Sequence, residues 1–373
     1  MDFDESVRYL YSLGHETLAL KLGLKTTQLL LNALHNPEGG YPSVQIAGTN
    51  GKGSTAVVLD SICRAAGIKT GLYTSPHLSS ITERIRIGGC DIDRNQFASL
   101  ATKVRSTVEQ LIYATALSAP PTFFEHVTAM ALLAFKEEFI QLAILETGLG
   151  GRLDSTTAAQ AGTVAITPIS LDHQEYLGKT LEEIAAEKAA IIRAGVTAVI
   201  APQDDAVNNV ILQRCAEVSV TPEISSFETE HMTFTAEGRA QLTLRIGDEV
   251  YPNLYLGLRG RHQIINVALA IEIAESLRDK GFEIDRRALS EGVAGARHPG
   301  RLELITGEPS ILFDGAHNAA GARALAAYLD EFAPRPVTIV FGAMMDKDLS
   351  EMSATLFPKA HALVLTAPDN PRA

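Results

Sequence analysis

The sequence has few of the features that mark secreted, membrane-spanning or nucleic-acid-binding proteins. Its three cysteines, Cys63, Cys90 and Cys215, are odd in number and far apart, which argues against a disulfide framework or a zinc knuckle and favours a reducing compartment. No apolar run approaches the length of a membrane span, and the first residues, MDFDESVRYLYSLGHE, contain no basic segment leading into an apolar one. We therefore expect a soluble, cytoplasmic protein without a membrane partner.

Positive charge is also scarce. Lys and Arg number 32 against 44 Asp and Glu, which gives a formal net charge of −12. General nucleic-acid binding needs an excess of basic residues on one face, so this composition argues against a nucleic-acid partner. A small anionic substrate is compatible with the charge, provided that local cations, metal ions or helix N-termini offset the negative background.

What the chain does contain is an alternation of strand-like and helical patterns. Hydrophobic residues make up 46% and charged residues 20%, which is enough for sizeable cores in two or three domains. This alternation is typical of βαβ units and a mostly parallel sheet with helices on both faces, so the predicted fold class is α/β. The clearest runs are SVQIAG, STAVVLDSICRAAG, KTGLYTS, LAILETG, TVAITPI and AVIAPQ.

Two departures from the alternation set the predicted domain organisation. Residues 232–258 alternate polar with apolar side chains and carry turn residues, so we expect a small antiparallel insertion there. Around GARHPGRLE the composition shifts to Gly, Pro and Arg, and a second α/β series follows. We place a boundary near residue 297, with a phosphate-loop domain at 1–297 and a smaller Rossmann-like domain at 298–373. Because the chain stops just after a predicted strand, we expect the second domain to be incomplete.

The stretch AGTNGKGST at 47–55 is the strongest site signal. It follows a predicted strand and opens a predicted helix, so its backbone N–H groups and the helix dipole can cradle phosphates, with Lys52 reaching their charge. In the common phosphate loop, Ser or Thr directly follows the lysine and binds Mg²⁺. Here Gly53 takes that place and Ser54 comes one residue later. We predict nucleotide binding, with a magnesium ligand supplied from elsewhere in the chain.

Polar residues follow three further predicted strands. Ser75 comes after one strand, Glu146 after another, and Asp172 and His173 after a third. Each has a plain structural reading, such as a helix cap, a turn residue or a loop histidine. Together with the phosphate loop, however, they would bring a hydroxyl, a carboxylate and an imidazole to one edge of the sheet, where doubly wound sheets bind ligands. Hard oxygen ligands suit Mg²⁺, and histidine is an unusual addition.

One lysine occupies a place that suits an apolar residue. In KTLEEIAAEKAAIIRAG, residues 179–195, Thr180 can cap a helix and Gly195 can end it. A lysine in an apolar stripe often lays its stem on apolar surface and keeps its ammonium in water, whereas burying an unpaired charge is costly. The stripe at three- and four-residue spacing reads Leu181, Ile184, Lys188 and Ile191.

Taken together, these motifs resemble the folylpolyglutamate synthase/dihydrofolate synthase family, a branch of the Mur-type ATP-dependent amide ligases. The resemblance covers nearly the whole chain, in the order and approximate spacing of that family. The glycine after Lys52 helps to separate this branch from the peptidoglycan ligases, which usually carry a hydroxyl residue there. The stretches that carry the resemblance are GTNGKGS, YTSPHL, ETGLGGRLDSTT, LDHQEYLG, EKAAIIRAG, GRHQIINVALA, PGRLE, FDGAHN and TAPDNPRA.

The resemblance implies how magnesium and the co-substrate ATP would bind. Ser75 and Glu146 would ligate a magnesium ion bridging the ATP phosphates, and Glu146, His173 and Lys188 would surround a second. In that family the lysine matching Lys188 is carbamylated by CO₂, and burial on the apolar stripe would favour the neutral amine that attacks CO₂. The positions matching the family's ATP contacts are Gly48, Thr49, Asn50, Gly51, Lys52, Gly53, Ser54, Asn266, Arg301 and Asp314.

The resemblance also implies where the other substrates bind. A ring such as Phe124 could stack on a flat heterocycle, although core packing is the usual role of phenylalanine. His317 resembles a residue implicated in the glutamate half-reaction, and an ordinary helix N-terminal residue is the competing reading. The predicted catalytic residues are therefore Lys52, Lys188 and His317. The segments matching pterin contacts are Thr122, Phe123, Phe124, Glu125, Leu153, Asp154 and Ser155.

The implied reaction is the ATP-dependent addition of L-glutamate to a pterin-linked carboxylate, in dihydropteroate, a reduced folate or both. Phosphoryl transfer from ATP forms an acyl phosphate, and the amine of L-glutamate then displaces phosphate. A cleft between two domains would keep water from the intermediate. The resemblance also implies a monomer.

Two alternatives stay open. One is a Mur-type ligase acting on another carboxylate, such as a cell-wall precursor; Gly53 and the YTSPH motif count against it. The other is a nucleotide-dependent switch. Against that reading stand the absence of an Asn-Lys-x-Asp guanine-reading motif and the crowding of predicted metal ligands.

Overall fold

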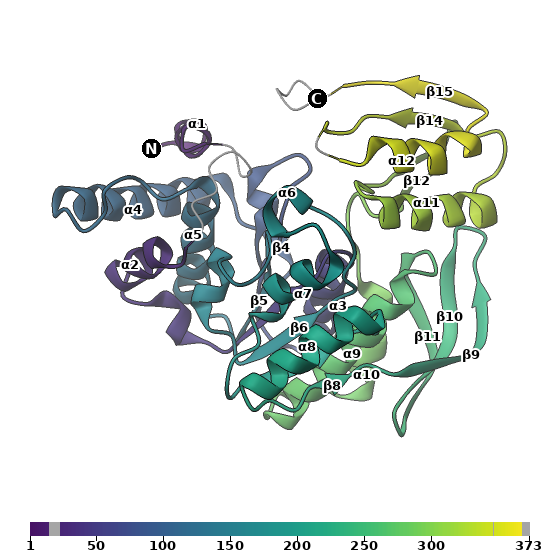
Figure 1. The fold of residues 1–373 in the computed structure, drawn as a ribbon, viewed down its shortest axis with the longest axis horizontal. Coiled ribbons are helices and arrows are strands. Elements are labelled where there is room, and N and C mark those ends of the chain that lie inside the picture. Colours follow the sequence, from purple (N-terminus) through teal and green to yellow (C-terminus); the bar gives the residue numbers. More distant parts are fainter. Residues whose placement is uncertain (15–22, 346, 368–373) are drawn as a thin grey trace.

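The computed structural model describes residues 1–14, 23–345 and 347–367. Figure 1 shows a large α/β unit, a three-stranded sheet beside it, and a smaller C-terminal α/β unit against the end of that sheet. This arrangement confirms the predicted fold class. Residues 368–373 of the TAPDNPRA motif lie outside the described residues. Within the described ranges, no helix is long and apolar enough to cross a membrane.

The large sheet has eight strands in the spatial order β4-β3-β2-β5-β1-β6-β7-β8. Every neighbouring pair from β2 to β8 is parallel, and β3 and β4 add an antiparallel edge beyond β2. The strands are β1 (Ser43–Ala47), β2 (Thr70–Tyr73), β3 (Ile85–Ile87), β4 (Cys90–Asp91), β5 (Leu142–Glu146), β6 (Thr163–Ile166), β7 (Thr197–Ile200) and β8 (Glu223–Ile224).

The inner strands explain the continuous apolar runs of the sequence. Every residue of β1, β2, β5 and β6 is buried, as expected for parallel strands covered on both faces. Side chains alternate between the two faces, so Val164 and Ile166 pack into one core and Ala165 packs into another. The carboxyl ends of these strands are therefore held rigidly by layers on either side.

Helices cover both faces of the large sheet. On one face α3, α9 and α10 share a core; on the other, α4 and α5 cover β2 and β5, and α7 and α8 cover β6 and β7. The helices are α1 (Phe3–Ser12), α2 (Lys25–Ala33), α3 (Lys52–Ala65), α4 (Arg94–Tyr113), α5 (Phe123–Glu137), α6 (Gln174–Leu177), α7 (Leu181–Ala189), α8 (Asp205–Glu217), α9 (Gln263–Asp279) and α10 (Arg286–Gly295), with 3₁₀ helices η1 (Pro37–Gly40), η2 (Ile81–Arg84) and η3 (Ser155–Ala159).

The remaining strands form three small sheets. The first is antiparallel, with the order β11-β10-β9; β12 pairs antiparallel with β13, and β14 pairs parallel with β15. The Tyr328 hydroxyl on α11 donates to the Glu237 carbonyl at 2.9 Å, which fixes the C-terminal unit to the three-stranded sheet. The elements are β9 (Phe227–Phe234), β10 (Arg239–Ile246), β11 (Glu249–Arg259), β12 (Glu303–Ile305), β13 (Ile311–Phe313), α11 (Ala319–Phe332), β14 (Thr338–Phe341), α12 (Leu349–Leu356), η4 (Phe357–Lys359) and β15 (Ala362–Leu365).

The helix around Lys188 begins as predicted but ends early. The Thr180 hydroxyl accepts from the Glu183 N–H, and the Glu183 carboxylate accepts from the Thr180 N–H, a capping box that satisfies two backbone donors. The helix α7 ends at Ala189. The prediction that Gly195 ends it was wrong, because the fully buried Ile191 and Ile192 turn the chain toward β7 first.

Candidate active site

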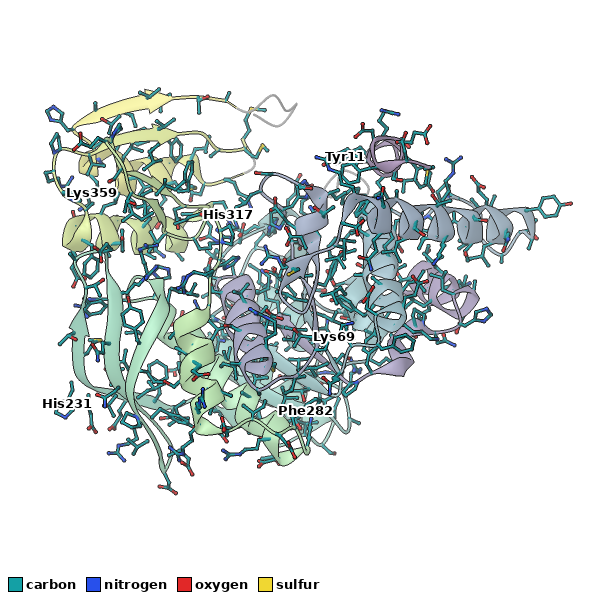
Figure 2. All side chains as sticks on the ribbon, turned by 180° about the vertical axis from the view of Figure 1, so that it is seen from behind. Tyr11, Lys69, His231, Phe282, His317 and Lys359 are labelled. Carbon is teal, nitrogen blue, oxygen red and sulfur yellow. The ribbon has the colours of Figure 1, made fainter. Side chains whose placement is uncertain are left out.

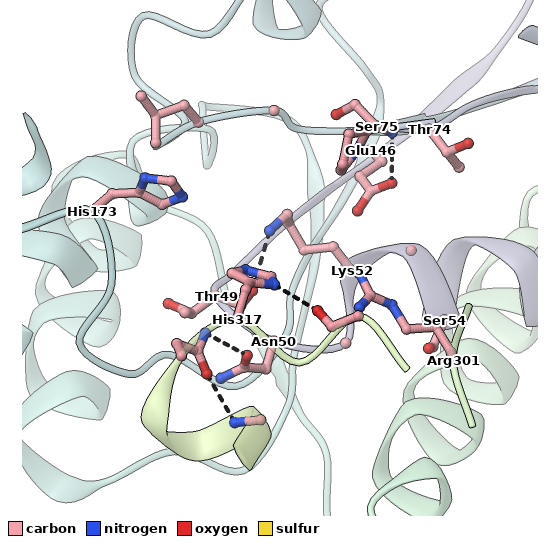
Figure 3. Close-up of a pocket in the computed structure, with 18 of the residues that line it drawn as sticks. Thr49, Asn50, Lys52, Ser54, Thr74, Ser75, Glu146, His173, Arg301 and His317 are labelled. Atoms are coloured by element: carbon pink, nitrogen blue, oxygen red, sulfur yellow. Dashed lines mark hydrogen bonds between the residues drawn. The ribbon is translucent and has the colours of Figure 1, made fainter. Parts of the chain in front are cut away.

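Four neighbouring parallel strands end at the same edge of the large sheet. β1 leads into the phosphate loop, β2 into Ser75, β6 into the segment with Asp172 and His173, and β5 ends on Glu146. Because β2, β5, β1 and β6 are adjacent and parallel, their carboxyl ends bring these groups together. Ser75, Glu146 and His173 line a cavity of about 710 Å³ that also receives residues from the C-terminal unit (Figure 3).

The phosphate loop has a backbone shape that requires glycine. Gly51 has φ of +89°, and a Cβ on it would lie 2.1 Å from Asn266 Oδ1. The Thr49 N–H donates to the Pro168 carbonyl at 3.1 Å, which holds the loop on the segment after β6. Lys52 begins α3, and its Nζ donates to the Thr49 carbonyl at 3.2 Å. A lysine at a glycine-rich helix N-terminus provides the donors and positive charge that phosphate needs.

The departure from the common phosphate loop has a geometric reason. A Cβ on Gly53 would lie 2.9 Å from His298 Cε1 and 3.2 and 3.3 Å from the two Glu146 carboxylate oxygens. The imidazole and the carboxylate thus occupy the space that a hydroxyl side chain would fill. The next residue, Ser54, instead contacts His298, with 3.2 Å between Oγ and Nδ1. Burial lowers the pKa of His298 to about 3, so the ring is neutral at this contact.

Opposite charges on Lys52 and Glu146 face the cavity beside the phosphate loop. Burial lowers the pKa of Lys52 and raises the pKa of Glu146, while the attraction between the two opposes both shifts. Glu146 is 6% exposed, and its Oε2 accepts from the Ser75 N–H at 3.1 Å. The Ser75 and Glu146 oxygens are of the hard type that Mg²⁺ prefers, and both residues line the cavity beside the phosphate loop. Ser75 and Glu146 therefore fit a magnesium ion that would take its other ligands from phosphates and water.

The remaining predicted metal ligands are His173 and Lys188. Among the described residues, no group of three or more His, Cys, Asp or Glu is arranged to hold a metal ion. Figure 3 shows His173 apart from Ser75 and Glu146. Its φ of +50° is left-handed, and burial lowers its pKa to about 4, which leaves the ring neutral and able to bind a metal.

Lys188 is buried, as its place in the apolar stripe indicates. It is 5% exposed, and its Nζ donates to the Gly48 carbonyl at 2.7 Å. Burial, followed by the nearby charge of Lys52, lowers the pKa of Lys188 to about 7. Neither Gly48 nor Lys188 lines the cavity, so the amine lies beneath the phosphate loop rather than open to the cleft.

Predicted ATP contacts from distant parts of the chain reach the same cavity. Asn266, Arg301 and Asp314 all line it. The Asp314 carboxylate accepts from the Leu302 N–H and the Ala316 N–H, both at 2.9 Å, and so joins the linker after α10 to the loop after β13. These two hydrogen bonds therefore hold the linker after α10 and the loop after β13 together where both line the cavity.

His317 and its neighbours connect the C-terminal unit to the large sheet. The His317 Nδ1 donates to the Gly315 carbonyl at 2.9 Å, and its Nε2 lies 3.5 Å from Asp172 Oδ2. Asp172 also accepts from Lys347 at 2.8 Å and from Asn318 at 3.1 Å. Burial acts to raise the pKa of Asp172, but the His317 hydrogen bond and the surrounding positive charges hold it well below its usual range.

The segment that matches the pterin contacts begins α5. Thr122 is its N-cap, and the Glu125 carboxylate accepts from the Thr122 N–H at 2.7 Å. Thr122, Phe124 and Glu125 line the cavity. Phe123 does not line it and instead stacks on Tyr11, with 5.6 Å between ring centroids. The pterin prediction is therefore corrected to exclude Phe123, since adjacent helix residues point about 100° apart.

The second pterin segment shapes a glycine-rich loop. Leu153, Asp154 and Ser155 line the cavity. The Asp154 carboxylate accepts from the Gly148 and Leu149 N–H groups at 3.0 and 2.9 Å, which folds the loop after β5 back toward η3. Burial raises the pKa of Asp154, against the effect of these hydrogen bonds. Its polar atoms are engaged in holding the loop.

The cavity-lining residues that sequence reasoning missed include His298, Asn318 and Lys347. His298 lies in the segment noted only for its Gly, Pro and Arg content. Asn318 directly follows His317 in FDGAHN, so its position carried a signal that was not used. Lys347 had no local signal, because its partner Asp172 is 175 residues away in the chain.

Comparison with known proteins places the chain in a family. The Mur ligase middle domain matches residues 46–274, and the Mur ligase glutamate ligase domain matches residues 300–373. A dihydrofolate synthase/folylpolyglutamate synthase from Mycobacterium tuberculosis is 37% identical over 92% of this chain and 74% of its own length. A probable bifunctional folylpolyglutamate synthase/dihydropteroate synthase from Haloferax volcanii is 34% identical over 99% of this chain. The chain spans 43% of the length of that relative.

A solved structure agrees with these sequence relatives. The FPGS–AMPPCP–folate complex, in which FPGS is folylpolyglutamate synthase, superposes with a TM-score of 0.92 at 30% identity, over 98% of this chain and 89% of that chain. The relatives and this structure match the chain almost from end to end, and the two family models match most of it from residue 46 onward. The chain therefore belongs to the Mur ligase family, and within it to the folylpolyglutamate synthase/dihydrofolate synthase branch.

Proposed function

We propose that the chain is an ATP-dependent ligase that joins L-glutamate to a pterin-linked carboxylate through an acyl phosphate. One observation carries this proposal: the phosphate loop, the two pterin-matching segments and His317 line a single cavity. The FPGS–AMPPCP–folate complex, which this chain resembles over almost its whole length, contains both an ATP analogue and a folate. Dihydropteroate, a reduced folate, or both would supply the carboxylate.

Phosphoryl transfer would take place at the Lys52 end of the cavity. The loop N–H groups and Lys52 would bind the phosphates of ATP, and Asn266, Arg301 and Asp314 would hold the rest of the nucleotide. Ser75 and Glu146 would hold Mg²⁺, which offsets charge on the transferring group when bound. Positioning and charge stabilisation are the main contributions that a protein makes to this kind of step.

Amide formation would take place where the C-terminal unit meets the phosphate loop. The amine of L-glutamate would approach the acyl phosphate past His317, and Phe124 would stack on the pterin of the other substrate. His317 is about half exposed, with 46% of its side chain accessible, so it can reach a ligand in the cavity. The contacts that Asn318 and Lys347 make with the large α/β unit beside the cavity would limit hydrolysis of the intermediate by water.

We also propose that Lys188 is carbamylated and that, with Glu146 and His173, it supports a second magnesium site. A pKa of about 7 provides neutral amine at ordinary pH, and the neutral amine is the form that attacks CO₂. His173 lies near enough for the charge of Lys188 to affect its pKa. On carbamylation, the Lys188 side chain would give up the hydrogen bond from its Nζ to the Gly48 carbonyl and would become a metal ligand.

The remaining proposals concern organisation and location. We propose a domain boundary near residue 297, at the linker between α10 and β12, with residues 298–373 forming the glutamate-ligase part. We propose that the protein acts as a monomer in the cytoplasm, in keeping with its three free cysteines.

The decisive experiment is phosphate release from Mg-ATP and L-glutamate, with dihydropteroate or tetrahydrofolate added in separate reactions. We expect release to require the pterin substrate, and Lys52→Ala to abolish it. Stimulation by dihydropteroate identifies dihydrofolate synthase activity, stimulation by tetrahydrofolate identifies chain extension, and stimulation by both identifies a bifunctional enzyme. If folded protein that binds ATP responds to neither, the folate assignment is wrong.

A further inference from the structure

We propose that Asn318 is a positioning residue that couples the phosphate loop to the part of the C-terminal unit that carries His317. The inference rests on the proposed ligase function. Asn318 is 4% exposed and directly precedes α11, whose N-cap it is. Its neighbour His317 lines the cavity together with Thr49 and Lys52 (Figure 3).

The Asn318 amide joins three parts of the molecule at once. Its Nδ2 donates to Asn50 Oδ1 at 3.0 Å and to Asp172 Oδ2 at 3.1 Å. Its Oδ1 accepts from the Gly321 N–H at 2.8 Å. Both amide hydrogens and the carbonyl are therefore engaged, and no other side chain of this size supplies two donors and one acceptor except an amide.

The two acceptors belong to different strand ends. Asn50 is part of the phosphate loop after β1, and its Nδ2 donates to Ser170 Oγ at 2.9 Å, which leaves its Oδ1 facing Asn318. Asp172 follows β6 and is also bound by Lys347. One side chain of the C-terminal unit thus fixes the phosphate loop and the β6 loop relative to each other and to α11.

Helix capping alone accounts for only part of this arrangement. Asn is a preferred N-cap because its side-chain oxygen accepts from the N–H two or three residues on, and the bond from Gly321 fulfils that role. Capping does not need the amide hydrogens. The two donations, made from a buried side chain to loops 268 and 146 residues away, would instead set where His317 lies relative to the nucleotide.

The exchange Asn318→Asp separates the two roles. Aspartate caps helices as well as asparagine, so α11 should remain intact, but a carboxylate cannot donate and would face the Asp172 carboxylate and Asn50 Oδ1. We expect kcat for amide formation to fall by about 100-fold, the loss that ~1 Å of misplacement causes, with a smaller change in KM for the pterin substrate. We also expect the Kd of Mg-ATP, measured without pterin or glutamate, to rise several-fold because Asn50 Oδ1 loses the hydrogen bond from Asn318.

A reciprocal exchange tests the contact itself. In the double variant Asn318→Asp with Asp172→Asn, the new amide can donate to the new carboxylate, so we expect kcat to recover at least about tenfold relative to Asn318→Asp, since restoring a paired contact makes the two effects non-additive. Asp285→Asn is the matched control. Asp285 caps α10 by accepting from the Ala288 N–H and does not line the cavity, so its exchange should leave kcat and the nucleotide Kd unchanged.

The outcomes are distinct. Wild-type kcat and nucleotide Kd in Asn318→Asp would overturn the proposal and leave Asn318 as a helix cap. Additive losses in the double variant would also overturn it. If Asn318→Asp does not fold, Asn318→Ser, which keeps a capping oxygen but cannot reach both acceptors, takes its place with the same expectations. If the wild-type chain is not a ligase for either pterin, the proposed function fails, and the nucleotide Kd alone decides whether Asn318 supports the phosphate loop.

Discussion

At Gly53, a single missing side chain determines how closely the phosphate loop approaches Glu146. Threonine would restore the common phosphate-loop pattern, but its Cβ would lie 2.9 Å from His298 and 3.2 Å from Glu146. His298 is held by its contact with Ser54 Oγ at 3.2 Å, so we expect the added side chain to displace the loop, the imidazole or both. We expect Gly53→Thr to lower kcat/KM for ATP by roughly 100-fold, the loss typical of a ~1 Å misplacement, as measured by steady-state kinetics at varied ATP.

The control is Gly39→Thr. Nothing lies within 4 Å of a Cβ at the exposed Gly39, so this variant should keep wild-type ATP kinetics. Full activity in Gly53→Thr would show that the crowding around Gly53 has no consequence for ATP.

Lys188 leads to a second prediction at the scale of one residue. With a pKa of about 7, its amine is increasingly neutral as the pH rises above 7 and protonated as the pH falls below it. We expect a carbamate carbon signal in NMR spectra of protein kept in ¹³C-bicarbonate at pH 8, weaker at pH 6, and absent from Lys188→Met. The other lysines serve as the internal control. A signal that survives in Lys188→Met would assign the carbamate to another site.

At the scale of elements, the contact between α1 and α5 contains a buried histidine. His126 is fully buried, its ring meets the edge of Tyr9 with 5.3 Å between centroids, and neither ring nitrogen has a hydrogen-bond partner within the described part of the chain. Burial lowers the pKa of His126 to about 4. Between pH 6.5 and 4 the unfolded chain therefore binds a proton that the folded chain does not, so the free energy of unfolding falls as the pH falls through this window.

We expect this histidine to account for about 3 kcal/mol of the stability lost between pH 7 and pH 4. Between pH 7 and pH 4, the free energy of unfolding of His126→Leu should therefore fall by about 3 kcal/mol less than that of wild type. Urea unfolding at both pH values measures this difference. At pH 7 the variant should be at least as stable, because no unpartnered ring nitrogen remains buried. His361→Leu, at an exposed position, should behave like wild type. Equal acid losses in His126→Leu and wild type would refute the assignment.

Most elements were predictable from the sequence because each is specified locally. Continuous apolar runs marked the strands buried on both faces, and Thr180 as a capping residue marked the start of α7. The end of α7 was not predictable in the same way. It depends on Ile191 and Ile192 packing into a core formed with β6 and β7, which no pattern within residues 179–195 contains.

At the scale of the whole molecule, one part of the site could be predicted from the sequence. The other part depends on how the C-terminal unit docks on the large α/β unit. The phosphate loop, Ser75 and Glu146 follow strands, and parallel strands deliver such residues to one edge. Arg301, Asp314 and His317 could be placed only by family resemblance. The contacts of Asn318 and Lys347 with Asp172 join segments 146 and 175 residues apart, so they depend on how the C-terminal unit docks.

That docking is the basis of the last prediction. The Lys347 Nζ lies 2.8 Å from the Asp172 carboxylate, with both side chains at most 10% exposed. Replacing Lys347 with methionine keeps the apolar stem but removes a charge that compensates a buried carboxylate, a change that typically costs about 3–5 kcal/mol. Because the pair bridges the two units, that cost falls on docking. We expect Lys347→Met to increase amide hydrogen exchange in α11 and α12, while β1, β5 and α3 stay protected.

An ion pair confined to the C-terminal unit provides the comparison. Lys359 pairs with Asp330 at 2.5 Å, with 29% and 48% of the two side chains exposed, and Figure 2 shows Lys359 away from His317 and the junction of the units. Pairs this exposed contribute about 0–1 kcal/mol, so Lys359→Met should leave the exchange pattern unchanged. If Lys347→Met instead raises exchange equally in every element, the pair stabilises the fold as a whole. If it raises exchange nowhere, docking rests on the other contacts of the C-terminal unit, which include the hydrogen bonds of Asn318 and Tyr328.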